Sequence, residues 1–483
     1  MAGIGFELNR LFNRKSIVSY IGAYTAAAMV FTGPMLLGVV LLFFVRIVSA
    51  MSGATLHEQD IIVVMITYAL IASMFLSNFF STTITRYVSD LLYTEKPKQV
   101  MPSLHGVIAA QITVGALFYG PFMVFSGAGP VYAALGFILF CELVVVWTLI
   151  SYISAVKDYV RIILVFALGV ASAIVMGLIL VFLTNLNTIA AMLCSVYLGY
   201  GVMVLGYYDS LKRYFPESEG GAFRFVKQFF LSPQLSLIGI CLSIGMFSHF
   251  VVVWLSPFGK PIIGLLRSAP LYDVPALFAF LSTLVTTINF STTTEVSFYP
   301  AYKNYYGLLN TNGSLQKIEL AEREMLTIIK RELVYLIFKQ FIVTLIVSTI
   351  GSAILTEANF AGFNATTRGL FRVLCVGYGI YASANGVLLI LFYFANYRDA
   401  LISTVLFAAG TIGCALYFAF TNADIYLYGF SIMGGGMLMY ISAVFFLWNY
   451  TRKLQYNIFS KQPLLALEQH GRLYHKLEWL WKE

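Results

Sequence analysis

The chain alternates between about a dozen long apolar runs and short polar gaps. Each run is roughly 20 residues or longer, which as a helix is enough to cross ~30 Å of hydrocarbon. The pattern predicts an all-α polytopic membrane protein with about 12 transmembrane helices. We expect the spans at residues 20–50, 61–92, 105–126, 130–156, 161–183, 188–207, 232–255, 272–299, 335–355, 367–395, 399–420 and 424–448.

Lys and Arg gather in every second gap and at both ends of the chain, whereas the turns at 126–130, 185–187 and 421–423 carry no positive charge. Cytoplasmic loops of membrane proteins are enriched in Lys and Arg, so both termini are predicted to be cytoplasmic. The basic loop residues are Lys96, Lys98, Lys157, Arg161, Lys212, Arg213, the series from Lys303 to Lys339, and Arg398. The exceptions on the outer side are Lys260, Arg267 and Arg368.

Composition removes several classes of function. The residues are 59% hydrophobic and 11% charged, far from the ~25% charged of soluble domains. The net charge of +8 sits in short loops that flank the spans, which argues against a nucleic-acid partner. The five cysteines lie inside apolar runs without CxxC spacing, and no Walker A or HExxH motif is present. We therefore expect a transporter, not an enzyme, with no metal and no cofactor.

The two halves of the chain share a tetrapeptide at matching places. Phe80-Ser81-Thr82-Thr83 lies late in the second span, and Phe290-Ser291-Thr292-Thr293 lies in the eighth, 210 residues later. We interpret this as a duplication of six spans, which relates two pseudo-symmetric lobes by an axis along the membrane normal. The predicted organisation is an N-terminal lobe 1–208, a cytoplasmic connector 209–223, a C-terminal lobe 224–450 with a cytoplasmic amphipathic loop 303–334, and a cytoplasmic amphipathic tail 451–483.

Charged residues at membrane depth cost at least ~2.5–3.5 kcal/mol on insertion scales, so they usually face a cavity or a partner. Glu142, midway along the fourth span, is the most deeply placed carboxylate. Arg86 and Glu295 hold nearly equivalent positions in the two halves, and we hypothesise that they form a salt bridge that closes an inner gate. The other intramembrane charges are Arg46, Asp273 and Arg372, for which snorkelling to the interface remains an equal alternative.

Tyrosines and threonines supply uncharged candidates for a substrate path. Tyrosine rings can stack on sugar rings, although packing and interface belts are the alternative. Threonines at matched places can line a path, or bond to carbonyls of their own helix. The substrate-path candidates, together with the carboxylate above, are Tyr20, Tyr24, Thr82, Thr83, Glu142, Thr292, Thr293 and Tyr299; Tyr302 and Thr294 accompany them.

Three segments have an amphipathic pattern: residues 4–17, residues 314–333 and the tail from Pro463. Each fits a helix that lies on the inner membrane surface. Docking of a cytosolic partner is the alternative, chiefly for residues 314–333 and the tail.

The opening MAGIGFELNRLF, the following YIGAYTAAAMVFTGPMLLGVV and the six-plus-six layout resemble the Pel exopolysaccharide transporter family of the multidrug/oligosaccharidyl-lipid/polysaccharide exporter superfamily. The resemblance implies that the first, second, seventh and eighth spans line a central cavity. It also implies export of a hexosamine-rich polymer across the bacterial cytoplasmic (inner) membrane for biofilm matrix formation. The implied partners are a cytosolic polysaccharide-synthesising glycosyltransferase (PelF-like), and a PelE-like protein and a PelD-like cyclic-di-GMP receptor in the membrane.

Two other transport functions stay open, besides a non-transport role such as a scaffold for the synthase. A flippase for lipid-linked oligosaccharide would need several Arg or Lys in the cavity to bind a diphosphate, and Arg46, Arg86 and Arg372 could serve only if they converge. A cation-coupled drug exporter would need a carboxylate within a lobe, for which Glu142 is the candidate.

Overall fold

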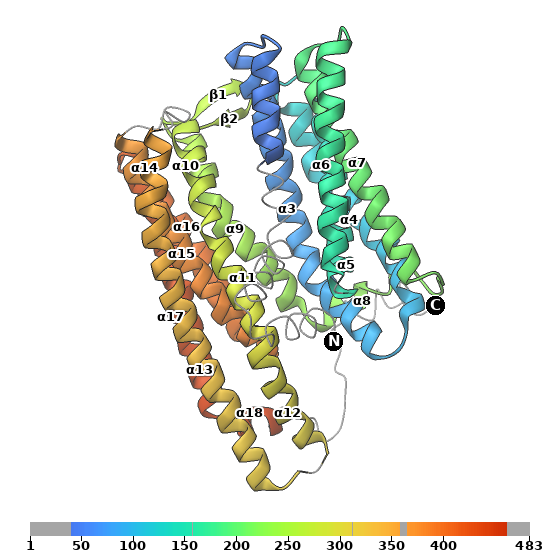
Figure 1. Ribbon diagram of the computed structural model, residues 1–483, viewed down its shortest axis with the longest axis vertical. Helices are drawn as coiled ribbons and strands as arrows, with labels where there is room; N and C mark the ends of the chain where they lie inside the picture. Colours follow the sequence, from blue (N-terminus) through green and yellow to red (C-terminus); the bar gives the residue numbers. More distant parts are fainter. Residues whose placement is uncertain (1–39, 157, 312, 358–364, 461–483) are drawn as a thin grey trace, which may run out of the picture. The chain divides into compact units, whose positions relative to one another are not determined.

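The computed structural model describes residues 40–156, 158–311, 313–357 and 365–460, and these residues are nearly all helical (Figure 1). Eleven of the described helices are long and apolar enough to cross a membrane. The helical residues Val40–Met51 form a shorter apolar helix at the end of the predicted first span, and the residues before them lie outside the described part. The prediction of a polytopic helical membrane protein is confirmed, whereas the six-plus-six division and the side of the termini stay predictions.

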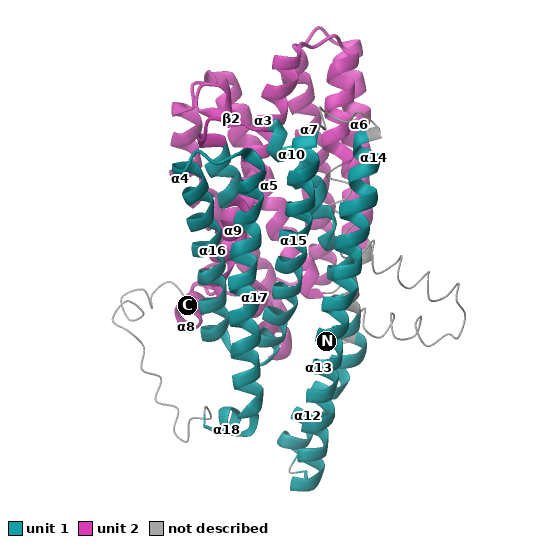
Figure 2. Cartoon of the chain, turned by 90° about the vertical axis from the view of Figure 1, so that its left-hand side faces the viewer, with its two compact units in different colours: residues 1–32, 248–253, 270–467 teal, residues 33–247, 254–269, 468–483 magenta. Residues whose placement is uncertain are grey.

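The described residues divide into two compact units (Figure 2). The first unit, coloured as unit 2 in Figure 2, takes the described residues up to 247 and residues 254–269. The second unit, coloured as unit 1 in Figure 2, takes residues 248–253 and the described residues from 270 onward. The division falls within one helix, α9. The helices up to that point are α3 (Leu56–Tyr93), a 3-10 turn η1 (Pro97–Gln99), α4 (Val100–Phe125), α5 (Pro130–Val156), α6 (Tyr159–Leu183), α7 (Thr188–Tyr214), α8 (Val226–Leu231) and α9 (Pro233–Leu255).

The remaining elements begin with the strands β1 (Lys260–Ile263) and β2 (Leu266–Ser268). The helices that follow are α10 (Pro270–Leu281), α11 (Thr283–Thr293), a π-helical turn η2 (Thr294–Phe298), α12 (Tyr299–Asn310), α13 (Leu315–Ile346), a π-helical turn η3 (Val347–Gly351), α14 (Ser352–Glu357), α15 (Ala365–Tyr393), α16 (Tyr397–Phe420), the 3-10 turn η5 (Ile425–Tyr428), α17 (Gly429–Arg452) and α18 (Leu454–Phe459).

Each unit is built around one central helix. In the first unit α5 packs against α3, α4 and α7 and buries Leu143, Leu149 and Tyr152 completely. In the second unit α15 packs against α10, α13 and α17. Helices without such a central place turn large apolar side chains outward, as membrane helices do toward lipid.

Small residues let α16 and α17 approach closely. A Cβ on Gly435 would lie 2.0 Å from the Thr411 hydroxyl and 2.8 Å from the Phe407 carbonyl oxygen. Glycine in a membrane helix often permits backbones to meet in this way. Gly435 is the middle residue of three consecutive glycines, Gly434, Gly435 and Gly436, and this triple glycine is thus a packing feature.

A two-stranded antiparallel hairpin follows α9 and is the exception to an all-α fold. Lys260 pairs with Ser268 and Ile263 with Leu266. The turn residue Gly264 has φ +53°, and its neighbour Leu265 donates its backbone N–H to the Ser126 carbonyl at 2.7 Å. Arg267 donates to the Gly259 carbonyl at 2.7 Å. This arginine, an exception to the predicted distribution of positive charge, therefore stabilises the hairpin.

The structure differs from the interpretation of residues 314–333 as a separate surface helix. They form the first half of α13, which continues through η3 into the predicted ninth span as one apolar helical segment of 42 residues, Leu315–Thr356. At 1.5 Å per residue that segment is about 60 Å long, about twice the hydrocarbon thickness. The reason is local: from Leu315 to Ile350 the chain has no Gly or Pro to end the helix.

α12 and α13 therefore form a helical hairpin, which we call the α12–α13 hairpin, with its tip where α12 ends and α13 begins (Figure 1). Near α18 it is fixed by a hydrogen bond from Gln455 Nε2 to Glu322 Oε2 at 2.6 Å. Burial raises the pKa of Tyr305 to about 12, and the Glu322 carboxylate adds to the rise. The Tyr305 hydroxyl therefore stays protonated at neutral pH.

Candidate functional site

Three polar side chains in the second half of α3 form hydrogen bonds to α9. Asn78 Nδ2 donates to Ser243 Oγ at 2.8 Å, and Thr82 Oγ1 donates to the Leu235 carbonyl oxygen at 2.8 Å. The hydroxyls of Thr83 and Ser236 lie 2.7 Å apart. Residues 78, 82 and 83 share one helix face because positions four apart lie on the same side of a helix.

α9 meets this face with small residues. Ser236, Gly239 and Ser243 follow one another at spacings of three and four residues, which brings them to one side. A Cβ on Gly239 would lie 2.0 Å from the Asn78 carbonyl oxygen, so the two backbones touch there. We call this contact, made by Asn78, Thr82 and Thr83 with Leu235, Ser236, Gly239 and Ser243, the α3–α9 seam.

The seam contains two of the predicted substrate-path residues, Thr82 and Thr83, and holds them in bonds between helices. Sequence reasoning missed Asn78, Ser236, Gly239 and Ser243. The available signal was the small-residue spacing on α9 together with the asparagine just before the repeated tetrapeptide. It does not by itself say which helix α9 contacts.

Beside the seam lies an apolar groove of about 490 Å³, bounded by α3, α4, α5 and α9. Aromatic rings dominate its walls, and its single hydroxyl group belongs to Tyr119. The residues that line it are Ala72, Phe75, Leu76, Phe79, Val114, Gly115, Phe118, Tyr119, Phe122, Phe140 and Ile240. This wall is more apolar than the Tyr, Thr and Ser lining that the sequence predicts for a substrate path.

The equivalent threonine of the second half behaves differently. Thr293 Oγ1 donates to the Phe290 carbonyl of its own helix at 3.2 Å, which is the intrahelical alternative named above. Tyr302, near the partly buried Tyr299, donates its hydroxyl to the Tyr393 carbonyl at 3.1 Å. Tyr20 and Tyr24 lie outside the described residues, as do the side chains of Thr292 and Glu295.

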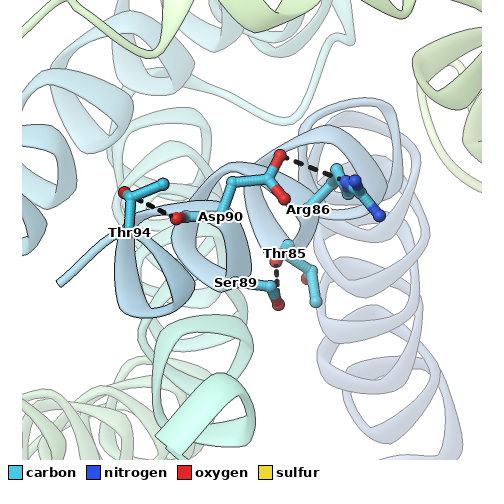
Figure 3. A network of polar contacts seen from close by, with 5 residues as sticks. All are labelled: Thr85, Arg86, Ser89, Asp90 and Thr94. Atoms are coloured by element: carbon cyan, nitrogen blue, oxygen red, sulfur yellow. Dashed lines mark hydrogen bonds and ion pairs between the residues drawn. The ribbon is translucent and has the colours of Figure 1, made fainter. Parts of the chain in front are cut away.

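Arg86 forms an ion pair with Asp90 one turn along α3, with Nε and Oδ2 3.1 Å apart (Figure 3). Both side chains are about half exposed, and the backbone of Asp90 also accepts from Thr94 at 2.8 Å. An exposed pair of this kind contributes little to stability. The gate hypothesis of Arg86 with Glu295 stays a prediction.

The other charged candidates lie on separate helices. Arg46 lies in the helix Val40–Met51, Asp273 in the first turn of α10, and the exposed Arg372 on α15, where Nη2 donates to Ser352 Oγ at 3.4 Å. Glu142 lies midway along α5, and its Oε2 is buried without a hydrogen-bond partner among the described residues. It is thus the intramembrane charge with the strongest reason to be functional.

If the chain is the exporter that the resemblance implies, we expect Glu142→Gln to reduce export at least ten-fold while the protein keeps or gains thermal stability. The amide has the size of the carboxyl but carries no charge, so it removes a cost at membrane depth, and it can no longer release a proton. Export and melting temperature measured on the same preparation test both parts. Glu95→Gln, on an exposed loop residue, is the matched control. Unaltered export by the Glu142 variant would exclude proton transfer there.

Comparison with known proteins gives a family and a fold. The profile of the family described as "PelG: Putative exopolysaccharide Exporter (EPS-E)" matches residues 1–459. No curated protein matches the chain. A MATE-family multidrug resistance transporter of the MOP superfamily in an outward-facing conformation matches with TM-score 0.57 and 15% identity, over 89% of this chain and 96% of the other.

Two further solved structures agree. A MOP-superfamily transporter from Pyrococcus furiosus matches with TM-score 0.56 and 14% identity, over 89% of this chain and 96% of the other. An inward-facing MATE-family transporter matches with TM-score 0.55 and 12% identity, over 90% and 100%. At these identities the likeness establishes a shared fold, that of MATE transporters.

Proposed function

The chain belongs to the PelG family of exopolysaccharide exporters, and from that premise we propose that it moves a hexosamine-rich exopolysaccharide, the Pel polymer, across the bacterial cytoplasmic membrane. A cytosolic glycosyltransferase makes the polymer, and the exported product serves the biofilm matrix. The chain itself is a transporter and catalyses no reaction.

The chemistry of the α3–α9 seam carries the proposal. Its three hydrogen bonds join hydroxyl, amide and backbone carbonyl groups, without an ion pair. Sugar hydroxyls and acetamido groups offer the same donors and acceptors. Such bonds can therefore be exchanged for bonds to a carbohydrate at little net cost, whereas an interhelical ion pair would have to be broken in a poorly solvated place.

The α12–α13 hairpin is the proposed docking site for the glycosyltransferase. In this hairpin α13 is much longer than is needed to cross the membrane, and the extra length lies on the side whose loops carry Lys and Arg. Near its tip Leu315 and Leu320 are about 70% exposed, among the charged residues Lys317, Glu319 and Glu324. Apolar anchors within a charged rim are typical of protein interfaces. The PelE-like and PelD-like membrane proteins remain proposed partners without an assigned surface.

The apolar groove favours one second candidate, a flippase for lipid-linked oligosaccharide. A groove lined by Phe and aliphatic side chains at membrane depth suits the hydrocarbon tail of a lipid carrier. The diphosphate of such a carrier needs converging cations, and the described Arg86 is already paired with Asp90. Polymer export is therefore the preferred function.

We expect deletion of the chain to abolish secreted polymer while the glycosyltransferase is still made. The decisive measurement uses inverted membrane vesicles that contain both proteins and a labelled, nucleotide-activated N-acetylhexosamine added outside. Polymer should become resistant to an added glycoside hydrolase only when the chain is present. Equal protection without the chain would reject the proposal, and accumulation of a labelled lipid-linked oligosaccharide in the deletion strain would favour the flippase.

A further inference from the structure

His249 on α9 is completely buried and lies in a group of aromatic residues that all belong to the second unit. Its Nδ1 lies 2.8 Å from the Tyr272 hydroxyl of α10, and its Nε2 lies 3.5 Å from the Tyr378 hydroxyl of α15. The Tyr272 hydroxyl also reaches the Tyr428 carbonyl oxygen at 3.3 Å. Phe250 stacks on the imidazole with ring centroids 4.4 Å apart.

We propose that His249, Tyr272, Tyr378 and the Tyr428 carbonyl form a proton-binding site, with the imidazole as the group that takes up and releases the proton. The proposal goes beyond the exporter function, and its main test does not use the polymer. The alternative is a neutral core histidine that never changes state.

The geometry satisfies both protonation states with the same heavy atoms. In the neutral ring Nδ1–H donates to Tyr272, the Tyr272 O–H donates to the Tyr428 carbonyl, and the Tyr378 O–H donates to Nε2. When a proton from water binds the Nε2 lone pair, only the Tyr378 hydroxyl hydrogen turns away, and its oxygen becomes an acceptor. No bond to carbon forms or breaks, and no co-reactant is needed.

The surroundings also suit a cation. The stacked face of Phe250 can attract an imidazolium ring. Asp273 directly follows Tyr272 on α10, so the helix that carries one of the two hydroxyl partners also carries a carboxylate. The other titratable groups facing the cluster are Cys375 and Tyr381, which act on Tyr378 from its own helix. α9 itself carries no Asp, Glu, Lys or Arg.

The position on α9 indicates where the proton comes from. His249 lies six residues before Leu255, the last residue of the helix, or about 9 Å along the axis at 1.5 Å per residue. That end is the one predicted to face outward. Gly239 of the α3–α9 seam lies ten residues earlier on the same helix, so one helix carries both features.

The test is a histidine titration of the full chain in lipid nanodiscs, labelled with ¹⁵N-histidine and read by NMR between pH 5 and 9. The chain has five histidines, and the variants His249→Gln and His105→Gln identify the signals of these two. His105 is exposed and has the Tyr208 hydroxyl as a partner at 3.1 Å. We expect the His249 signal to move reversibly between the neutral and doubly protonated positions. Tyr272→Phe should lower its proton affinity about ten-fold, because the Nδ1–H bond to Tyr272 is made in both states but is stronger when the ring is charged, and leave His105 unchanged.

A His249 signal that keeps one protonation state across this range would overturn the proposal. So would titration of His249 that is indifferent to Tyr272→Phe. As a second readout, the dependence of export on external pH should flatten in His249→Gln but persist in His105→Gln. The titration is done on protein that exports no polymer, so its result does not depend on the proposed function.

Discussion

Gly239→Ala is expected to lower export at least ten-fold and to destabilise the protein by about 1–3 kcal/mol, the usual range for overpacking. The added methyl group would lie 2.0 Å from the carbonyl oxygen and 2.8 Å from the carbonyl carbon of Asn78. These are backbone atoms of α3, which cannot turn aside as a flexible side chain can. The two helices must therefore separate.

Separation of the helices would lengthen the bonds that Thr82 and Thr83 make across the seam. If the seam must close in each transport cycle, the loss of export will exceed what the loss of folded protein explains. Export measured in inverted vesicles, divided by the amount of folded protein, gives this comparison. Thermal unfolding of the purified variant gives the stability.

Gly201→Ala is the matched control. Gly201 is also a helical glycine, on α7, but a Cβ there meets no heavy atom within 4 Å. Since Ala favours a helix by up to about 1 kcal/mol over Gly, this variant should export normally and be no less stable. Normal export by both variants would show that close approach of α3 and α9 is not needed.

The sequence predicted the bounds of a helix well where the helix and its apolar run begin and end at the same residues. The predicted and observed bounds of α5 are both 130–156, because Pro130 starts the helix and the apolar run stops before Lys157. Residues 314–333 were predicted as a separate amphipathic helix before a span that starts at 335, whereas α13 runs without a break from Leu315. Hydropathy reports where a helix enters lipid, whereas Glu, Lys, Ala and Leu continue the same helix in water.

Contacts distant in sequence were the least predictable. The repeated tetrapeptide drew attention to Thr82 and Thr83, but their partners on α9 lie 153 residues away. The β-hairpin also depends on such a contact: Tyr68 accepts from the backbone N–H of Arg267 at 3.1 Å, across 199 residues. Strands of four and three residues give too short an alternation to be recognised without that partner.

Shortening the α12–α13 hairpin should abolish export without preventing insertion of the chain. We would replace residues 306–319 with the turn Gly-Asn-Gly-Ser, which removes five residues from each arm together with the loop between them. The change keeps Tyr305, which is buried, and Glu322, which accepts a hydrogen bond from Gln455. The change removes one partly buried ring, Tyr306, which packs on Tyr302 and Tyr305 with ring centroids 4.4 and 5.3 Å apart. The melting temperature should therefore fall only slightly.

The physical reason for the expected loss is that the removed tip carries the exposed Leu315 and the charges Lys317 and Glu319, part of the proposed interface. Fewer than a third of interface residues usually supply most of the binding energy, so loss of such an anchor should release the glycosyltransferase. Co-purification of the two proteins should fall at least ten-fold, and polymer protection in vesicles should fall with it. The double variant Asn310→Ala with Thr311→Ala, which keeps both arms at full length, should retain the partner. If the shortened chain still binds the glycosyltransferase and exports polymer, docking must occur elsewhere, and the long first half of α13 would need another explanation.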